Sequence, residues 1–228
     1  GAPKAVILAA SRGTELGDLT ENRPKCMVDV RGKPLLRRLV DTLHSGEVRD
    51  ITVVRGYRKD MVNLPSIRLI DNDDFDRSGE AATLSCALDV LRDDCIIAYG
   101  DILFRQHIMD QLLAAEDDVV IVVDAMWKER DPDSRSRPRD LVSCSAPFRT
   151  SYIDDGPVLA RHIGPELPET DIDGEWIGLA RVRGPGTEAV VAGLEALSKD
   201  GGLAGASLCD LFNNLIADGQ EVRVIYIT

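Results

Sequence analysis

The sequence predicts an α/β fold in which helices flank a mostly parallel sheet. Two observations carry this prediction: short apolar runs suited to buried strands, and stretches of helical periodicity between them. The strands are expected at residues 6–9, 51–54, 67–70, 96–99 and 119–123. Strands separated by helices of this length indicate βαβ units with right-handed crossovers, and such units build a Rossmann-like sheet. Ligands bind at the carboxyl ends of the strands in sheets of this kind.

The first predicted helix follows Pro34 and ends at Gly46, residues that suit the start and the end of a helix. Apolar side chains recur on one face of it at helical spacing, namely Leu35, Leu36, Leu39, Val40 and Leu43. Two more helices are expected at residues 81–91 and 107–115.

The character of the sequence changes after residue 126. Residues 127–149 are polar and carry little periodicity. The later elements are expected as alternating segments at 158–163 and 176–182, helices at 188–197 and 208–217, and a last strand at 222–227. We therefore expect one domain over 1–228, with a core of 4–126 and 176–228 and a smaller lobe of 127–175.

Composition and charge exclude several classes of partner. The 228 residues carry a net charge of −12 at pH 7. Nucleic acids and anionic membranes need a basic face, so neither is expected as a partner, and no apolar run approaches the length of about 18 residues that spans a membrane. The five cysteines form no CxxC pair, which argues against a disulfide framework or a zinc site and favours reduced thiols in the cytoplasm. The sequence indicates no oligomeric state.

The strongest functional signal lies in residues 5–28. An apolar strand ends in a Ser-Arg-Gly-Thr turn at 11–14, and the polar loop after it closes on Lys25. Glycine lets the backbone approach a ligand and present its N–H groups, while Arg12 and Lys25 supply positive charge. The pattern predicts a polyphosphate-binding loop; the alternative is that both cations are ordinary surface charges.

The same run resembles the LAAGxGTRLxxxTxxxPKxxxxV motif of nucleotidyltransferases, which attach a nucleoside monophosphate to a phosphorylated small molecule. The residues in register are Leu8, Ala9, Ala10, Gly13, Thr14, Leu16, Thr20, Pro24, Lys25 and Val28. The resemblance implies that Lys25 contacts the α-phosphate of a nucleoside triphosphate and Arg12 the β- and γ-phosphates. Two residues depart from the motif: Ser11 replaces a glycine, and Glu15 stands where arginine is common. A carboxylate repels a triphosphate unless it pairs with a cation or contacts a metal.

Nucleotidyl transfer needs alignment and charge neutralisation more than a strong base, because the attacking oxygen is already anionic. The three histidines have no evident partner, which fits electrostatic catalysis with Mg²⁺. Asp101, at the end of a predicted strand in YGDILF, resembles the metal-binding aspartate of the family. Asp210, in SLCDLFNNLI, resembles a second, late-chain ligand, with an exposed helical acid as the alternative.

Residues 72–88 resemble the loop and helix that hold the base and ribose, although a plain amphipathic helix explains the same pattern. Small residues at a helix start leave room for a base and supply hydrogen-bond donors. The nucleotide-binding residues expected from this segment and the first loop are Leu8, Ala9, Ala10, Ser11, Gly13, Asn72, Gly79, Glu80, Ala81 and Thr83.

The acceptor side is expected in the lobe, where residues 127–149 hold six cations against four acids. The cations are Lys128, Arg130, Arg135, Arg137, Arg139 and Arg149, and the acids are Glu129, Asp131, Asp133 and Asp140. This local positive excess suits a compact dianionic acceptor. The alternative is a solvated, flexible loop.

Over nearly the whole chain the sequence resembles the cytidylyltransferases of phosphonate biosynthesis, through AASRGTELG, RPKCMVDVRGKPLLRRLVDTL, YGDILF, DAMWKERD and GEWIGLARV. The resemblance implies CTP as donor and a small phosphonate, such as 2-hydroxyethylphosphonate, as acceptor. It also implies acceptor contacts from Lys128, Glu175 and Trp176. Some of these enzymes are fused to phosphoenolpyruvate mutase, and a chain that starts at Gly1 without an initiator Met fits a domain cut from such a fusion.

Two other functions stay open on the sequence. A sugar-1-phosphate or phosphocholine nucleotidyltransferase shares the whole N-terminal argument. A catalytically silent, nucleotide-binding regulatory domain would explain Ser11 and Glu15. A dinucleotide oxidoreductase is not expected, because no GxGxxG follows the first strand.

Overall fold

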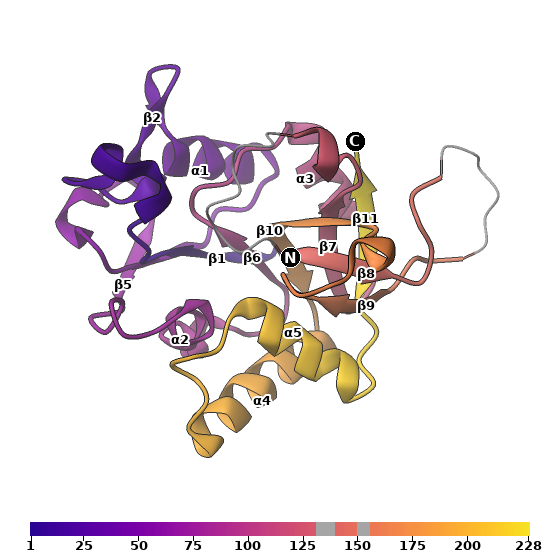
Figure 1. Ribbon diagram of the computed structural model, residues 1–228. Helices are drawn as coiled ribbons and strands as arrows, with labels where there is room; N and C mark the ends of the chain where they lie inside the picture. Colours follow the sequence, from indigo (N-terminus) through magenta and orange to yellow (C-terminus); the bar gives the residue numbers. More distant parts are fainter. Residues whose placement is uncertain (131–139, 150–155) are drawn as a thin grey trace.

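The predicted α/β architecture is confirmed by a computed structural model, which describes residues 1–130, 140–149 and 156–228. The central sheet has the strand order β11-β7-β10-β6-β1-β4-β5 (Figure 1). These strands are β1 (Lys4–Ala9), β4 (Ile51–Arg55), β5 (Arg68–Asp71), β6 (Cys95–Tyr99), β7 (Val119–Asp124), β10 (Gly174–Val182) and β11 (Arg223–Ile227). Strand β1 pairs in parallel with β4 and β6, whereas β10 runs antiparallel to both of its neighbours, β6 and β7.

Two smaller features extend this sheet or stand apart from it. Strand β8 (Leu141–Cys144) pairs with the start of β10 and with β9 (Ala160–Ile163), so part of the predicted lobe is antiparallel sheet. Strands β2 (Asp29–Val30) and β3 (Lys33–Pro34) form a separate hairpin.

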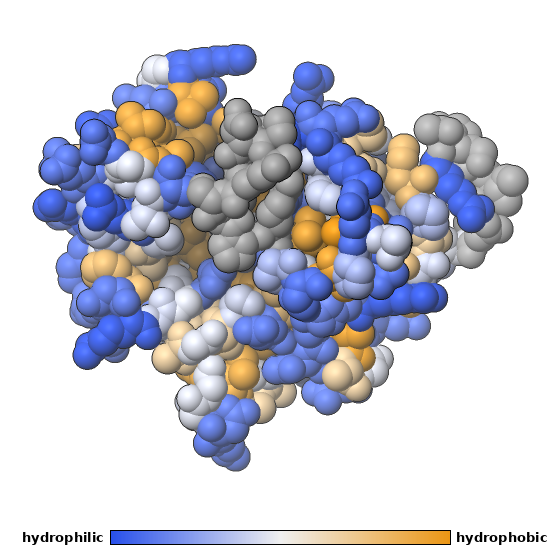
Figure 2. All heavy atoms as spheres, in the orientation of Figure 1, coloured by the Kyte–Doolittle hydropathy of each residue, from blue (hydrophilic) through white to orange (hydrophobic). Residues whose placement is uncertain are grey.

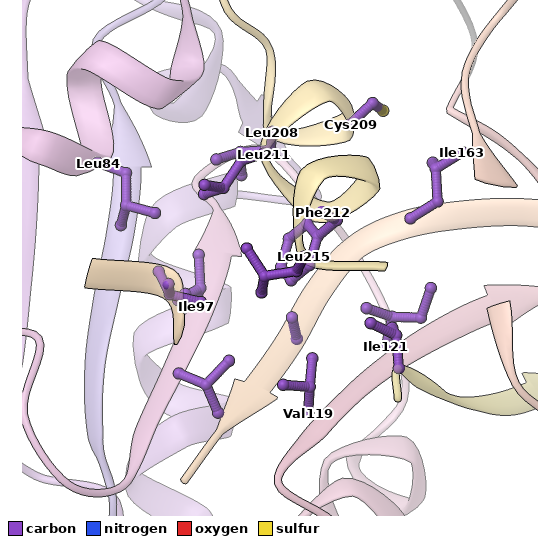
Figure 3. Packing of buried hydrophobic residues seen from close by; sticks show 14 of the residues in the cluster. Leu84, Ile97, Val119, Ile121, Ile163, Leu208, Cys209, Leu211, Phe212 and Leu215 are labelled. Atoms are coloured by element: carbon purple, nitrogen blue, oxygen red, sulfur yellow. The ribbon is translucent and has the colours of Figure 1, made fainter. Parts of the chain in front are cut away.

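Helices cover both faces of the sheet, α1 and α3 on one side and α2, α4 and α5 on the other (Figure 1). They are α1 (Leu35–Ser45), α2 (Glu80–Ser85), α3 (Gln106–Ala114), α4 (Pro185–Asp200) and α5 (Leu208–Ala217). On the first side the predicted apolar face of α1 is buried against the sheet. On the second side Leu211, Phe212 and Leu215 of α5 lie over Ile97 and Ile121 of the strands (Figure 3). These two apolar layers, one on each face, hold the sheet in place. The candidate site lies at the edge of the sheet where its parallel strands end.

The predicted helix over 81–91 is wrong in its length. Helix α2 ends at Ser85, and a 3-10 turn follows over Leu88–Val90. Ala87 leaves the helical region, with φ −100° and ψ 22°, and both Ala87 and Leu91 are buried in the core. The apolar spacing that suggested one long helix therefore serves a short helix and a turn that bury the same face.

The surface is largely polar on the side drawn in Figure 2. The face in Figure 2 is mostly hydrophilic, with apolar side chains in smaller patches. None of the helices within the described residues is long and apolar enough to cross a bilayer. All five cysteines are free thiols, and the cytoplasmic location inferred from them stays a prediction. The predicted cations Arg135, Arg137 and Arg139, and the acids Asp131 and Asp133, lie outside the described residues.

A buried arginine of β10 binds the loop before β6 and the end of α3. Arg181 is only 6% exposed, and its guanidinium donates to both carboxylate oxygens of Asp94, at 2.9 and 2.7 Å. The same group donates to the main-chain carbonyl of Leu113 at 2.6 Å, at the end of α3. A buried cation of this kind is tolerated because each of its three nitrogens donates to an acceptor.

Replacing Arg181 by alanine should lower the free energy of unfolding by about 3 kcal/mol, because it leaves buried carbonyls and Asp94 without their donor. Urea denaturation of the purified protein measures this. Arg49→Ala is the matched control, since Arg49 pairs with Glu47 on the surface with both side chains more than two-thirds exposed. Equal stability of the two variants would contradict the assignment.

Candidate active site

A cleft of about 780 Å³ opens at the carboxyl ends of β1 and β6. It is formed by the loops after these strands, the start of α2 and the start of α5. The predicted site residues that line it are Leu8, Ala9, Ala10, Ser11, Arg12, Gly13, Lys25, Gly79, Glu80, Thr83 and Asp101. The location at the strand ends is the one expected from the fold.

The loop after β1 is held in place by its own backbone and by Lys25. Gly13 adopts a left-handed conformation with φ 75°, and a Cβ there would lie 2.6 Å from the Cβ of Lys25. The glycine therefore lets Lys25 lie against the loop. The main-chain N–H of Lys25 donates to the carbonyl of Arg12 at 3.1 Å. Ser11 has no positive φ, so serine is tolerated where the motif has glycine.

Thr20 and Tyr57, which follow later in the chain, anchor the same loop. Thr20 is buried, and its hydroxyl donates to the carbonyl of Gly13 at 3.2 Å. The hydroxyl of Tyr57 donates to the carbonyl of Thr20 at 2.7 Å, and the guanidinium of Arg12 lies over the Tyr57 ring, 5.3 Å from its centroid. Tyr57 also lines the cleft. Tyr57 was not among the site residues predicted from the sequence, and the available signal was an aromatic residue two positions after the end of β4.

Lys25 bridges two carboxylates in the cleft. Its Nζ lies 2.9 Å from Glu15 Oε1 and 2.8 Å from Asp101 Oδ2, and all three side chains are about one-fifth exposed, at 19, 22 and 19%. This pairing gives the unexpected carboxylate at position 15 a cationic partner, which Glu15 shares with Asp101. An incoming polyphosphate must compete with Glu15 and Asp101 for the ammonium group.

The remaining wall of the cleft is acidic and carries two buried protonated groups. Asp140 and Glu80 line it, and burial and the charges of these two carboxylates raise the pKa of Tyr99 well above its ordinary value. The thiol of Cys209 donates to Asp140 Oδ1 at 3.1 Å, and burial followed by the Asp140 charge raises the pKa of Cys209. Burial and Asp101 raise the pKa of Cys26 to about 12. Neither cleft thiol is therefore a thiolate nucleophile at neutral pH.

Two predicted nucleotide contacts lie behind the cleft wall. Asn72 is buried, and its Nδ2 donates to the hydroxyls of Thr83 at 3.0 Å and Ser78 at 3.2 Å. Ala81 is fully buried in the core, and its N–H donates to the carbonyl of Ala206. Neither lines the cleft, so both act by holding the loop that does.

The second predicted metal ligand, Asp210, lies outside the lining of the cleft. It is in the first turn of α5, where its carboxylate accepts from the N–H of Ser207 at 2.9 Å and its own N–H donates to the Ser207 hydroxyl at 3.0 Å. This reciprocal pair is a helix-capping box. Asp210 therefore occupies the position of an acid at the start of a helix, the alternative to a metal ligand that the sequence left open.

The three predicted acceptor residues do not line the cleft either. Trp176 is 2% exposed, and its indole N–H donates to the carbonyl of Leu179 at 3.0 Å, so it is a core residue. Lys128 is exposed, and its Nζ lies 3.4 Å from Glu169 Oε1. Glu175 is at the start of β10, paired in register with Asp124 of β7. Periodicity and resemblance did not distinguish side chains that support the cleft from those that face it.

The carboxylates of the cleft fit Mg²⁺ only in part. Within the described ranges no group of three or more histidine, cysteine or acidic side chains is arranged to hold a metal. Mg²⁺ is commonly bound by one or two carboxylates together with substrate phosphates. Asp101 meets that need, with Glu15 on the other side of Lys25 as a second oxygen donor.

A second cavity, of about 790 Å³, lies on the side of α1 and α3 and includes Arg105, Arg130 and Asp124. No residue of the phosphate-loop motif lines it. Arg130 is paired with the buried Asp124 at 2.7 Å. The cleft with Lys25 is therefore the candidate active site.

Comparison with known proteins identifies the family of the chain. Residues 5–132 match the family model of the MobA-like NTP transferase domain. The CTP:phosphoglutamine cytidylyltransferase of Campylobacter jejuni is 28% identical over 208 residues, which cover 86% of this chain and 79% of that protein. The choline-phosphate cytidylyltransferase of Streptococcus pneumoniae is 31% identical over 113 residues, which cover 48% of this chain and 49% of that protein.

Solved structures show the same fold. The CTP:phosphocholine cytidylyltransferase of Streptococcus pneumoniae superposes with a TM-score of 0.65 at 23% identity, covering 99% of this chain and 90% of the other. The inositol-1-phosphate CTP transferase of T. maritima gives a TM-score of 0.76 at 18% identity, covering 99% and 86%.

The pairing of Lys25 predicts that Glu15→Gln strengthens the binding of inorganic tripolyphosphate by about fivefold, because removal of one competing carboxylate beside Lys25 is worth about 1 kcal/mol. Isothermal titration calorimetry at low ionic strength measures the affinity. Glu47→Gln, which removes an exposed carboxylate outside the cleft, should leave it unchanged. Weaker binding by Glu15→Gln would show instead that Glu15 is needed to place Lys25.

Proposed function

Because the chain belongs to the MobA-like NTP transferase family, we propose that it transfers CMP from CTP to a small phosphate- or phosphonate-bearing acceptor and releases pyrophosphate. The position of Lys25 beside Asp101 in the cleft carries the proposal. A cation and a carboxylate 2.8 Å apart at the end of a strand supply the two charges that a metal-bound triphosphate needs.

The reaction needs little covalent help from the protein. An anionic oxygen of the acceptor attacks the α-phosphorus in line, a new P–O bond forms, and the bond to the bridging oxygen breaks as pyrophosphate leaves with the electron pair. Lys25 stabilises the charge that develops at the α-phosphate, and Arg12, on the exposed side of the loop, contacts the β- and γ-phosphates. No general base is required, and the described residues that line the cleft include no histidine.

Mg²⁺ is the proposed cofactor, and it would supply positive charge that neutralises the phosphates of the nucleotide. Asp101 is the residue of this chain that would hold it. Glu15, on the other side of Lys25, would offer a second carboxylate to the same ion.

CTP is proposed as the nucleotide because the Campylobacter, Streptococcus and T. maritima proteins are all named for it. The base and ribose would lie against Gly79, Glu80 and Thr83, which line the cleft at the start of α2. Gly79 itself is fixed, since its N–H donates to the carbonyl of Ala204 at 2.9 Å.

For the acceptor we propose a small phosphonate such as 2-hydroxyethylphosphonate, on the strength of the sequence resemblance, which also suggests a natural fusion to phosphoenolpyruvate mutase. The second candidate is a phosphate ester, because the relatives are named for phosphoglutamine, phosphocholine and inositol-1-phosphate. All these acceptors present an anionic oxygen to the same chemistry.

Pyrophosphate release with CTP, UTP, ATP, GTP or dTTP against 2-hydroxyethylphosphonate, 2-aminoethylphosphonate, phosphocholine and glucose-1-phosphate tests the proposal. We expect turnover with CTP and a phosphonate in the presence of Mg²⁺. Lys25→Ala should lower kcat/KM by about 100-fold or more, as expected when a preorganised charge at the reacting phosphate is lost.

Lys33→Ala is the matched control, because Lys33 pairs with Asp41 away from the cleft. Turnover with glucose-1-phosphate alone would move the protein to the sugar-phosphate branch. CTP binding without turnover on any acceptor would favour a regulatory domain.

A further inference from the structure

The hydroxyl of Tyr99 is an unexplained polar group in the core of the site. Its oxygen is buried and has no hydrogen-bond partner within the described residues. Tyr99 ends β6 and lines the cleft. A buried hydroxyl without a partner costs about 1–3 kcal/mol, so its retention needs a reason.

The ring of Tyr99 is clamped and cannot turn its hydroxyl elsewhere. Gly178 has φ +87°, and a Cβ at this glycine would lie 2.2 Å from Tyr99 Cδ2, so the ring lies directly on the backbone of β10. The ring centroid is 5.6 Å from that of Trp176, which in turn packs edge-on against Phe212 at 5.3 Å. Trp176, expected to touch the acceptor, instead holds the ring of Tyr99.

Asp140 is fixed on the same wall by the same strand. Its main-chain carbonyl accepts from the N–H of Trp176 at 2.8 Å, and its Oδ1 accepts from the thiol of Cys209 at 3.1 Å. That contact holds the carboxylate of Asp140 at the wall of the cleft. Both Asp140 and Cys209 line the cleft.

We propose that Tyr99 and Asp140 form the subsite for the end of the acceptor that is remote from phosphorus, and that this end carries a hydrogen-bond donor, either a hydroxyl or an ammonium group. The inference deepens the proposed function and rests on it. A hydroxyl would donate to Asp140 and accept from Tyr99, whereas an ammonium would donate to both. The acidic wall repels the phosphorus end, which therefore turns to Lys25 and Arg12.

The specificity of such a subsite comes from groups that are left unpaired by the wrong ligand. A site built to bind a hydroxyl or amine discriminates strongly against an analogue that lacks it, because its own buried polar atoms then stay unsatisfied. The orphan hydroxyl of Tyr99 is such an atom.

The test is direct binding of three acceptors that differ only at the remote end: 2-hydroxyethylphosphonate, 2-aminoethylphosphonate and ethylphosphonate. Titration calorimetry with Mg²⁺ and α,β-methylene-CTP, which does not react, gives each Kd. The wild type should bind at least one of the first two about tenfold or more tightly than ethylphosphonate, and the tighter of them identifies the donor. In Tyr99→Phe and Asp140→Asn this ratio should fall toward one.

Tyr226→Phe is the matched control, because the Tyr226 hydroxyl donates to the carbonyl of Ala146 at 2.7 Å and Tyr226 does not line the cleft. It should keep the wild-type ratio. Tyr99→Phe should keep the Tm of the free protein, since the hydroxyl it loses has no partner there.

Equal binding of all three phosphonates by the wild type would overturn the inference. So would a Tyr99→Phe protein that loses Tm and affinity for α,β-methylene-CTP in parallel with the acceptor, because that would show a structural role. Discrimination among the phosphonates without pyrophosphate release would leave the subsite intact and contradict only the transfer reaction.

Discussion

The parallel pairing of β1 with β6 is the constraint on which the site depends. Leu8 lies in register with Tyr99, and the N–H of Gly100 donates to the carbonyl of Leu8 at 2.9 Å. Because both strands end at the same edge, the phosphate loop and Asp101 leave the sheet side by side. The ion pair between Lys25 and Asp101 follows from this register, and a slip of one residue would turn these side chains to opposite faces.

The acidic character of the cleft has a consistent physical meaning. Lys25 is held between Glu15 and Asp101 at 2.9 and 2.8 Å, so it is placed before any ligand arrives. A preorganised charge loses little freedom when the ligand binds. Because the net charge is −12, the proposed anionic substrates would be attracted by this local arrangement and not by the field of the whole protein.

The positions of local motifs could be predicted from the sequence, whereas tertiary relationships could not. The strand ends, the phosphate loop and Asp101 follow from short stretches of sequence, because a strand that stops at a glycine-containing turn fixes its own local geometry. Asp210 and Trp176 were assigned to the site by resemblance, but a helix cap and a core indole use the same residue types. Tyr57 and Asp140 reach the cleft only through strand pairings that no local pattern encodes.

A crystal structure with α,β-methylene-CTP and Mg²⁺ tests the account most directly. We expect a triphosphate in the cleft, with Lys25 Nζ within hydrogen-bond distance of an α-phosphate oxygen. We also expect that Glu15 is no longer bonded to Lys25. A triphosphate bound instead in the second cavity near Arg105, with Lys25 still paired to Asp101, would contradict it.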